Sequence, residues 1–261
     1  MVVELGSRRL LVDPMLGTAG SIPPFSFFRY RPRWNPLQEL PPASASLLED
    51  IDACLITHSR ALNLRFLQHL DHLDPAGEKF LRERVVQVAC PCQDAPYLER
   101  YGLTIAWSCE PWVETPFLDG TVKAVPALHG YGWVHRLMAN GVGYLLRFPG
   151  EPSLYISGDT VLTEDVRRAL TEERPDVAVV AAGGARLDVG RKLLMNEDEL
   201  QEFIDLAPGR VVANHMDALN HCPMTRERLR ALVRQKGWEE KVLIPEDGEC
   251  LELLESSRWP E

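Results

Sequence analysis

Potential metal-ligating side chains stand where short apolar segments of this chain end, and this pattern limits the possible folds more than any other feature. His58 follows the apolar segment 52–56, Asp159 follows 153–156, and His215 follows 210–213. Short apolar runs of this kind are typical of buried strands. A side chain at the end of a strand is held rigidly at its base. We therefore expect these side chains to converge in one cleft.

The histidines are concentrated in a few places. Six of the seven fall within four short segments of the chain, each suited to a metal ligand. These six are His58, His69, His72, His129, His215 and His221. Imidazole nitrogens and carboxylate oxygens are donors that bind zinc, manganese or iron. The sequence therefore predicts a metal site, while the seventh histidine, His135, shows no partner pattern.

The apolar pattern predicts strands that first follow one another and later alternate with helices. Strands are expected over 2–5, 9–14, 52–56, 85–89, 121–126, 143–148, 153–156, 176–182, 210–213 and 241–244. Helices are expected over 61–73, 94–101, 164–173, 196–206 and 225–236. The proline-rich and aromatic stretch 17–42 is expected to be irregular. This order favours an α/β layered structure with mixed sheets.

Length and charge narrow the class of function. The 261 residues are sufficient for one large domain over 1–261, and no linker or repeat divides them. A formal net charge of −10 disfavours a nucleic-acid surface, and a nuclease in particular. Apolar runs such as 177–182 are too short to span a membrane, and the N-terminus lacks the features of a signal peptide. Six cysteines without framework spacing indicate reduced thiols, so we expect a cytoplasmic protein. The acidic charge is compatible with a small-molecule substrate, which is the partner that we expect.

Several motifs resemble those of the metallo-β-lactamase superfamily in their order and strand context. They are Leu11-Val12-Asp13-Pro14, Thr57-His58, His129-Gly130, Tyr155-Ile156-Ser157-Gly158-Asp159-Thr160 and His215. Longer stretches resemble one branch of it, the ascorbate-6-phosphate-lactonase-like hydrolases, over 13–16, 20–25, 151–156, 215–222 and 242–248. The match covers nearly the whole chain. It implies an αββα sandwich of two mixed β-sheets flanked by helices, with a metal site along one edge of the packed sheets.

The resemblance also implies the ligands of two divalent ions, zinc first and manganese or iron as alternatives. One ion would be held by His58, His69 and His129, and the other by Asp71, His72 and His215, with Asp159 bridging both. Asp13 resembles the carboxylate that orients a ligand imidazole from behind. Asp71 and His221 are the candidates for a catalytic role. For His221, contact with substrate, support of a ligand or plain packing all remain open.

The family signature His-x-His-x-Asp-His is interrupted here, and two alignments compete. Without a gap, Arg60, Leu62 and Asn63 take three ligand positions, which implies a dead site or one weak metal. With residues 60–68 as an insertion, the segment 69–72 completes the signature. The stretch 72–91 then also resembles the helix-then-strand segment of the family without a further gap.

Two objections stand against the insertion. Nine residues must bulge out between His58 and His69 without moving either side chain. In addition, Leu62, Phe66, Leu70 and Leu73 have helical spacing, which would make His69 and His72 solvated residues of an amphipathic helix.

The sequence therefore predicts a metal-dependent hydrolase that uses a metal-bound hydroxide on a small ester, lactone or phosphoester. No Gly-x-Ser-x-Gly motif offers a competing serine nucleophile. The alternative is a non-catalytic protein of the same fold that binds a ligand or partner at a degenerate site. The stretch 25–34 mixes three arginines with five aromatic residues and could receive an anionic substrate. A packed loop or a contact between copies in a homo-oligomer is the favoured interpretation of that stretch.

Overall fold

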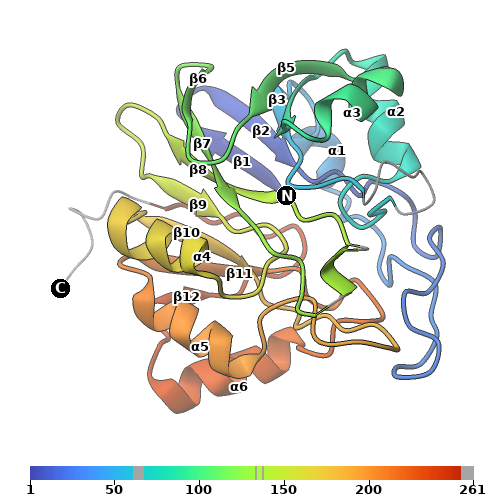
Figure 1. Ribbon diagram of the computed structural model, residues 1–261, viewed down its shortest axis with the longest axis vertical. Coiled ribbons are helices and arrows are strands. Elements are labelled where there is room, and N and C mark those ends of the chain that lie inside the picture. The colour runs from blue at the N-terminus through green and yellow to red at the C-terminus, as the bar shows by residue number, and fades with distance from the viewer. Residues whose placement is uncertain (61–67, 133, 137, 254–261) are drawn as a thin grey trace.

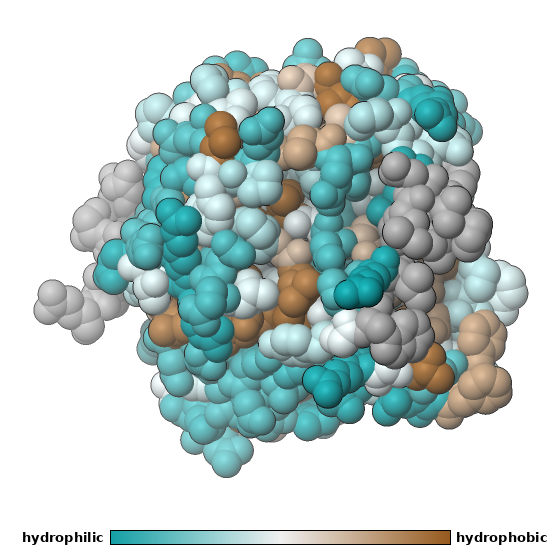
Figure 2. All heavy atoms as spheres, viewed as in Figure 1, coloured by the Kyte–Doolittle hydropathy of each residue, from teal (hydrophilic) through white to brown (hydrophobic). Residues whose placement is uncertain are grey.

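The structure is a computed structural model that describes residues 1–60, 68–132, 134–136 and 138–253. Two β-sheets lie face to face, and helices cover the outer face of each (Figure 1). Most of the face seen in Figure 1 is hydrophilic, and apolar residues show only in separate small areas (Figure 2). This arrangement is the αββα sandwich expected from the sequence.

The first sheet is built from the N-terminal part of the chain. It contains β1 (Val2–Leu5), β2 (Arg8–Val12), β3 (Ala53–Leu55), β4 (Gln87–Pro91) and β5 (Thr104–Cys109), in that order. β1 and β2 are antiparallel, whereas β2 to β5 pair in parallel. The sheet is therefore mixed.

The second sheet contains the remaining strands, β6 (Glu114–Phe117), β7 (Gly120–Pro126), β8 (Val142–Arg147), β9 (Leu154–Ile156), β10 (Val177–Ala181), β11 (Arg210–Asn214) and β12 (Val242–Leu243). Their order is β12-β11-β10-β9-β8-β7-β6. β6 to β9 pair antiparallel, and β9 to β12 pair in parallel. The early meander and later strand–helix alternation predicted from the sequence are both present.

The helices are α1 (Ser44–Leu47), α2 (Pro75–Glu83), α3 (Ala95–Arg100), α4 (Glu164–Arg168), α5 (Glu197–Leu206) and α6 (Arg226–Lys236). A 3₁₀ turn, η2, spans Val134–Arg136, and a π-helical turn, η3, extends α4 over Ala169–Glu173. Three of the longer helices begin at side-chain caps, because Asp74, Asn196 and Thr225 each accept a hydrogen bond from a backbone amide three residues later.

Alternation along the strands explains why their sequences are apolar throughout. In β2, Leu10 and Val12 face the core between the two sheets, whereas Leu11 faces α2 and α3. In β10, Val177 and Val179 face the same central core, whereas Ala178 and Val180 face the side covered by α5 and α6. Because both faces of each sheet are covered, both sets of side chains must be apolar.

Part of the helix predicted over 61–73 is wrong. Residues 61–67 lie outside the described part of the chain, and 68–73 form a bridge and a turn rather than a helix. The helix begins at Pro75, because Asp74 caps it and proline is favoured in the first turn. The strands β5 and β6 were not predicted, and the strand expected over 85–89 begins at Gln87.

Among the helices of the described residues, none combines the length and the apolar character that crossing a bilayer requires. The single-domain division over 1–261, the cytoplasmic location and a homo-oligomeric state stay predictions.

Candidate metal centre

His58 is placed by anchored residues on either side of it. The residue before it, Thr57, follows the end of β3 and donates to Asp13 from its amide and its hydroxyl, both at 2.8 Å. Ser59 donates to the buried carboxylate of Asp94 from its amide at 2.9 Å and its hydroxyl at 2.8 Å. Thr57 Oγ1 also lies 3.0 Å from His58 Nδ1, which leaves Nε2 to face the centre. The imidazole therefore has one defined orientation.

A glycine makes this placement possible. A Cβ atom on Gly141 would lie 2.2 Å from the carbonyl oxygen of Thr57 and 2.5 Å from the Cβ of His58. Contacts this short do not occur in folded proteins, so any larger residue would push the segment that carries His58 out of place.

The two ends of the proposed insertion, residues 60–68, lie together. Arg60 and Gln68 form an isolated antiparallel bridge, and the amide of His69 donates to the carbonyl of Ser59 at 2.8 Å. Residues 61–67 lie outside the described residues; they include Leu62 and Asn63 of the competing alignment and Phe66 of the helical pattern. Closure at the base removes the geometric objection to an insertion, because the chain on either side of it is held together.

Side-chain contacts hold Gln68, the residue that pairs with Arg60. The side-chain Nε2 of Gln68 donates to the carbonyl of Leu73 at 2.7 Å and to Glu78 Oε1 at 2.8 Å. The hydroxyl of Tyr97 donates to Gln68 Oε1 at 3.2 Å. The guanidinium of Arg60 lies over the ring of Tyr97.

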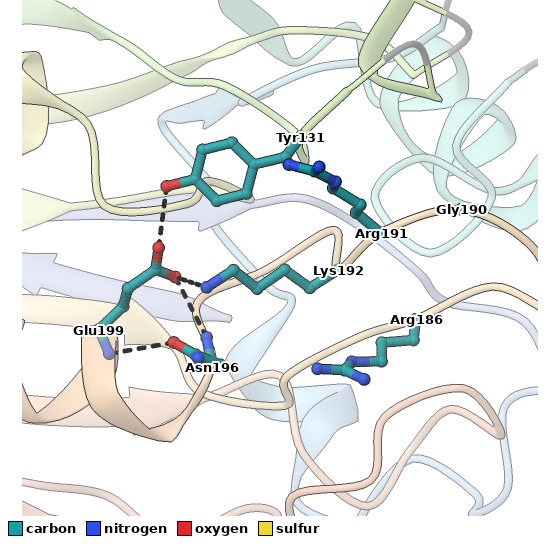
Figure 3. A pocket seen from close by; sticks show the side chains of 7 residues that line it. All are labelled: Tyr131, Arg186, Gly190, Arg191, Lys192, Asn196 and Glu199. Carbon is teal, nitrogen blue, oxygen red and sulfur yellow. Dashed lines mark hydrogen bonds and ion pairs between the residues drawn. The ribbon is translucent and has the colours of Figure 1, made fainter.

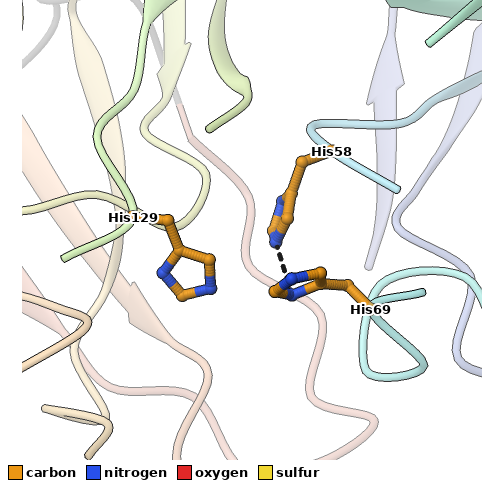
Figure 4. Close-up of side chains that lie close together, drawn as sticks. All are labelled: His58, His69 and His129. Carbon is orange, nitrogen blue, oxygen red and sulfur yellow. Dashed lines mark hydrogen bonds between the residues drawn. The ribbon is translucent and has the colours of Figure 1, made fainter. Parts of the chain in front are cut away.

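Three imidazoles form the first donor group, which we call the histidine group: His58, His69 and His129. One ring nitrogen from each lies within 4.8 Å of the others, and His58 Nε2 is 3.2 Å from His69 Nδ1. Figure 4 shows the three rings pointing toward one another from separate parts of the chain. The Nδ1 of His129 lies 3.3 Å from the carbonyl oxygen of Leu193, so its Nε2 is directed inward.

The second donor group, the mixed group, contains Asp71, His72, Asp159 and His215, whose ligand atoms also lie within 4.8 Å of one another. Asp159 Oδ2 is 3.3 Å from His72 Nε2 and 3.6 Å from His215 Nε2. The same oxygen is 3.5 Å from the Nε2 of His129 in the histidine group. Asp159 therefore lies between the two groups.

Asp13 and His215 have a backbone conformation that is unusual for residues other than glycine. Asp13 has φ of 46° and His215 has φ of 58°, in the left-handed region that non-glycine residues rarely adopt. Each such residue stores strain that the surrounding fold must offset, and such positions cluster at functional sites. Asp13 is held by Thr57 and by His72, whose Nδ1 lies 2.8 Å from Asp13 Oδ2.

The donors fit a divalent cation, because several of their buried polar atoms have no hydrogen-bond partner. Among the described residues these include His72 Nε2, His215 Nε2 and Asp159 Oδ1. A buried polar atom without a partner costs about 1–3 kcal/mol. These three atoms belong to residues of the mixed group, so a cation held by that group would give them a partner.

The charge states of the donors also suit a cation. Burial lowers the pKa of His58, His69 and His129, that of His69 to about 3, so these rings are neutral. Neutral imidazole is the form that binds metal. Burial alone would raise the pKa of Asp159, but the neighbouring His215 and His72 hold it well below its ordinary value.

The pKa of His72 reflects the negative charge around the mixed group. Burial disfavours its charged form, but Asp159, Asp13 and Asp71 outweigh that effect and raise the pKa of His72 well above its ordinary value. Three carboxylates around one imidazole make this a strongly negative buried place, which a divalent cation would neutralise.

His221 belongs to neither group but lies beside them. It is buried, its ring meets the edge of Phe25 with centroids 5.0 Å apart, and its Nδ1 has no hydrogen-bond partner among the described residues. Burial lowers the pKa of His221 to about 4, so the ring is neutral. The partly buried Cys222 places its Sγ 3.6 Å from His215 Nδ1.

The sequence did not identify Asp94 or Asn140 as part of this centre. Asp94 holds Ser59, and Asn140 Oδ1 accepts a hydrogen bond from the amide of His129 at 3.1 Å. Neither residue stands in a motif, and Asp94 appeared only as the start of a predicted helix.

The aromatic and arginine-rich stretch 25–34 is fixed to the protein by one carboxylate. Asp188 accepts hydrogen bonds from Ser26 Oγ and from the amides of Phe27, Phe28 and Arg29, at 2.6 to 3.0 Å. Phe28 is nevertheless 92% exposed. The backbone is thus anchored, while some of its aromatic side chains face outward.

Two mixed sheets between helices, with histidines and aspartates gathered at the strand ends, define the class of metallo-β-lactamase-fold proteins. Residues 8–216 match the family model described as "Beta-lactamase superfamily domain", so the chain belongs to this superfamily and to its UPF0173 metal-dependent hydrolases. The superfamily and the fold expected from the sequence are confirmed.

Two relatives support the assignment to the UPF0173 family. The UPF0173 protein YddR of Bacillus subtilis is 29% identical over 252 residues, covering 95% of this chain and 94% of the relative. A UPF0173 metal-dependent hydrolase of Alkaliphilus metalliredigens is 30% identical over 186 residues, covering 70% of this chain and 68% of the relative. The comparisons do not bear on the lactonase-like branch, which stays a prediction.

Solved structures share the fold closely. A possible metal-dependent hydrolase from Veillonella parvula has a TM-score of 0.84 and 23% identity, covering 95% of this chain and 94% of the other. An isothiocyanate hydrolase from Delia radicum gut bacteria also has a TM-score of 0.84, with 26% identity and coverage of 97% and 95%. This chain is therefore a member of a metal-dependent hydrolase family that carries histidine and aspartate groups able to bind a divalent metal.

Proposed function

We propose that the protein is a hydrolase that holds two divalent cations, with zinc the favoured ion and manganese or iron the alternatives. The observation that carries this proposal is the convergence of seven buried or nearly buried donors in two adjoining groups. Their composition, imidazole with carboxylate, suits these ions.

The histidine group would hold one cation and the mixed group the other. Asp159 would bridge them, since its Oδ2 lies 3.3 to 3.6 Å from nitrogens of both groups. Asp13 would fix the ring of His72 through the 2.8 Å contact to its Nδ1, which leaves Nε2 as the ligand atom.

When bound, the cations would supply a hydroxide near neutral pH and stabilise negative charge that develops on the substrate. Asp71 would orient that nucleophile; in support, its neighbours His72 and His69 outweigh the effect of burial and lower its pKa, which favours the charged carboxylate. His221 is neutral and has a free buried nitrogen, so it can donate or accept a hydrogen bond at the substrate.

We infer that the substrate is a small ester, lactone or phosphoester. The relationship to an isothiocyanate hydrolase at 26% identity supports attack at an electrophilic carbon in this fold. The non-catalytic alternative requires Arg60 or Asn63 in a vacated ligand position. Arg60 lies over Tyr97 instead, and Asn63 lies outside the described residues.

The test is the metal content of protein purified without a chelator, together with hydrolysis of a panel of chromogenic esters, lactones and phosphoesters. We expect about two equivalents of metal and activity that is lost on chelation and restored by the ion. Asp159→Asn, which keeps the side-chain size, should lower both metal content and activity.

Asp198→Asn is the matched control, since Asp198 is an exposed carboxylate on α5. It should leave both quantities unchanged. Fewer than one equivalent of metal in the wild-type protein, with no effect of Asp159→Asn, would remove the proposal.

A further inference from the structure

A pocket of about 520 Å³ opens at the surface beside the first turn of α5, and its lining carries several cationic side chains. We call it the cationic pocket (Figure 3). Its lining includes Tyr131, Arg186, Arg191, Lys192, Asn196 and Glu199. A volume of this size suits a small molecule or part of one.

Chain segments that line the cationic pocket also contact residues of the metal centre. The carbonyl of Leu193, directly after Lys192, lies 3.3 Å from Nδ1 of His129. The amide of Arg186 donates to the carbonyl of His221 at 3.0 Å. The segments that line the pocket therefore also touch a proposed metal ligand and the proposed substrate-contacting histidine.

The single acidic side chain among these lining residues is already neutralised. Glu199 pairs with Lys192 Nζ at 2.7 Å and accepts a hydrogen bond from the hydroxyl of Tyr131 at 2.8 Å. The amide of Asn196 donates to the same carboxylate at 3.3 Å. Figure 3 shows these groups gathered around Glu199 on one side of the pocket.

The two arginines are left as net positive charge. Across the described part of the chain, the guanidinium groups of Arg186 and Arg191 form no hydrogen bond or ion pair with a protein group. Figure 3 shows Arg186 extending into the open space and Arg191 beside the ring of Tyr131.

We propose that the cationic pocket binds an oxyanion, a carboxylate or a phosphate group carried by the substrate. The planar fork of an arginine matches the paired oxygens of both groups, and two such forks in one pocket give orientation as well as charge. This inference rests on the proposed function in that the bound group would belong to the molecule that is hydrolysed.

The first experiment measures binding directly. Inorganic phosphate and succinate are titrated by calorimetry into the purified, metal-loaded protein and into the Arg186→Gln/Arg191→Gln variant. We expect the double variant to bind the preferred probe at least about tenfold more weakly, because it loses charge-assisted hydrogen bonds. Arg234→Gln serves as the control. Arg234 is an exposed arginine on α6 that does not line the pocket, so its loss should leave probe binding unchanged.

The second experiment measures selectivity with a neutral ester and a matched ester that carries a carboxylate. The wild-type protein should have the higher kcat/KM for the anionic ester, and the double variant should lose that preference while keeping kcat/KM for the neutral one. In the titration, tighter binding of inorganic phosphate would indicate a phosphate site, and tighter binding of succinate would indicate a carboxylate site.

Equal probe binding by the wild type and the double variant would overturn the inference, as would absence of binding to both. In either case hydrolysis of the neutral ester could still proceed, so the proposed function would stand. Conversely, arginine-dependent probe binding in a protein without hydrolytic activity would support the pocket and reject the proposed function.

Discussion

The amide of His69 donates a hydrogen bond to the carbonyl of Ser59 at 2.8 Å, and so joins the two ends of the proposed insertion, residues 60–68. Ser59 directly follows His58, so this bond brings the two histidines on either side of the insertion together. Their rings lie with centroids 4.6 Å apart. An insertion closed at its base can change in length without displacing the donors, because its ends are fixed by the fold.

Removing the histidine after the insertion should remove metal. His69→Ala is expected to lower the bound metal by about one equivalent, because the histidine group would lose one of its three donors. Elemental analysis of the purified variant measures this loss. His135→Ala is the matched control, since His135 contacts Asn140 and belongs to neither donor group. Unchanged metal in His69→Ala would favour the alignment without an insertion.

Asp13 should tune metal affinity without binding the metal. Asp13→Asn is expected to weaken metal binding about 10- to 100-fold, because the ring of His72 loses its negatively charged partner. Asparagine tolerates the left-handed backbone that residue 13 adopts, so the fold should be retained.

A competition titration with a chromogenic chelator measures that change. Asp52→Asn provides the comparison, because Asp52 bonds to Arg8 and the amide of Arg9 at the other end of β2. Equal metal affinities for Asp13→Asn and the wild type would show that the contact to His72 has no role in binding.

His221 should affect turnover rather than metal content. His221→Gln is expected to lower kcat about 10²- to 10⁴-fold, the range for loss of a side chain that moves a proton in the reaction. Parallel measurements of metal content and kcat separate this role from packing. Phe25→Leu removes only the ring that packs on His221 and should have a smaller effect. A loss of metal that parallels the loss of rate would contradict a catalytic role.

Asp188 should make the anchoring of stretch 25–34 depend on pH. Backbone amides of Arg29, Phe27 and Phe28 and the hydroxyl of Ser26 hold the pKa of Asp188 well below its ordinary value. Its stabilising effect is therefore complete above the ordinary aspartate pKa of about 4 and is lost as the pH falls toward the lowered pKa.

The thermal midpoint of Asp188→Ala should lie below that of the wild type at pH 7, and the difference should shrink as the pH is lowered below about 4. Scanning calorimetry at several pH values measures this. A difference between the two midpoints that stays constant down to the lowest pH would show that the charge of Asp188 is not what holds the loop.

The sequence by itself determined the layered fold and the strand-end donors. Apolar runs such as 177–181 and 210–213 are local patterns, and they predict buried strands wherever the chain places them. His58, Asp159 and His215 follow such runs directly, so their convergence could be expected before any contact was known.

Only the tertiary structure decided the path of the interrupted signature and the location of the cationic pocket. Gln68 is held by Glu78 and Tyr97, and Ser59 is held by Asp94, through contacts that no local pattern contains. Arg186 and Arg191 likewise look like ordinary loop arginines until the fold sets them in one pocket with Tyr131 and Glu199. Local periodicity follows from backbone geometry and can be read along the chain, whereas these pairings depend on which distant segments pack together.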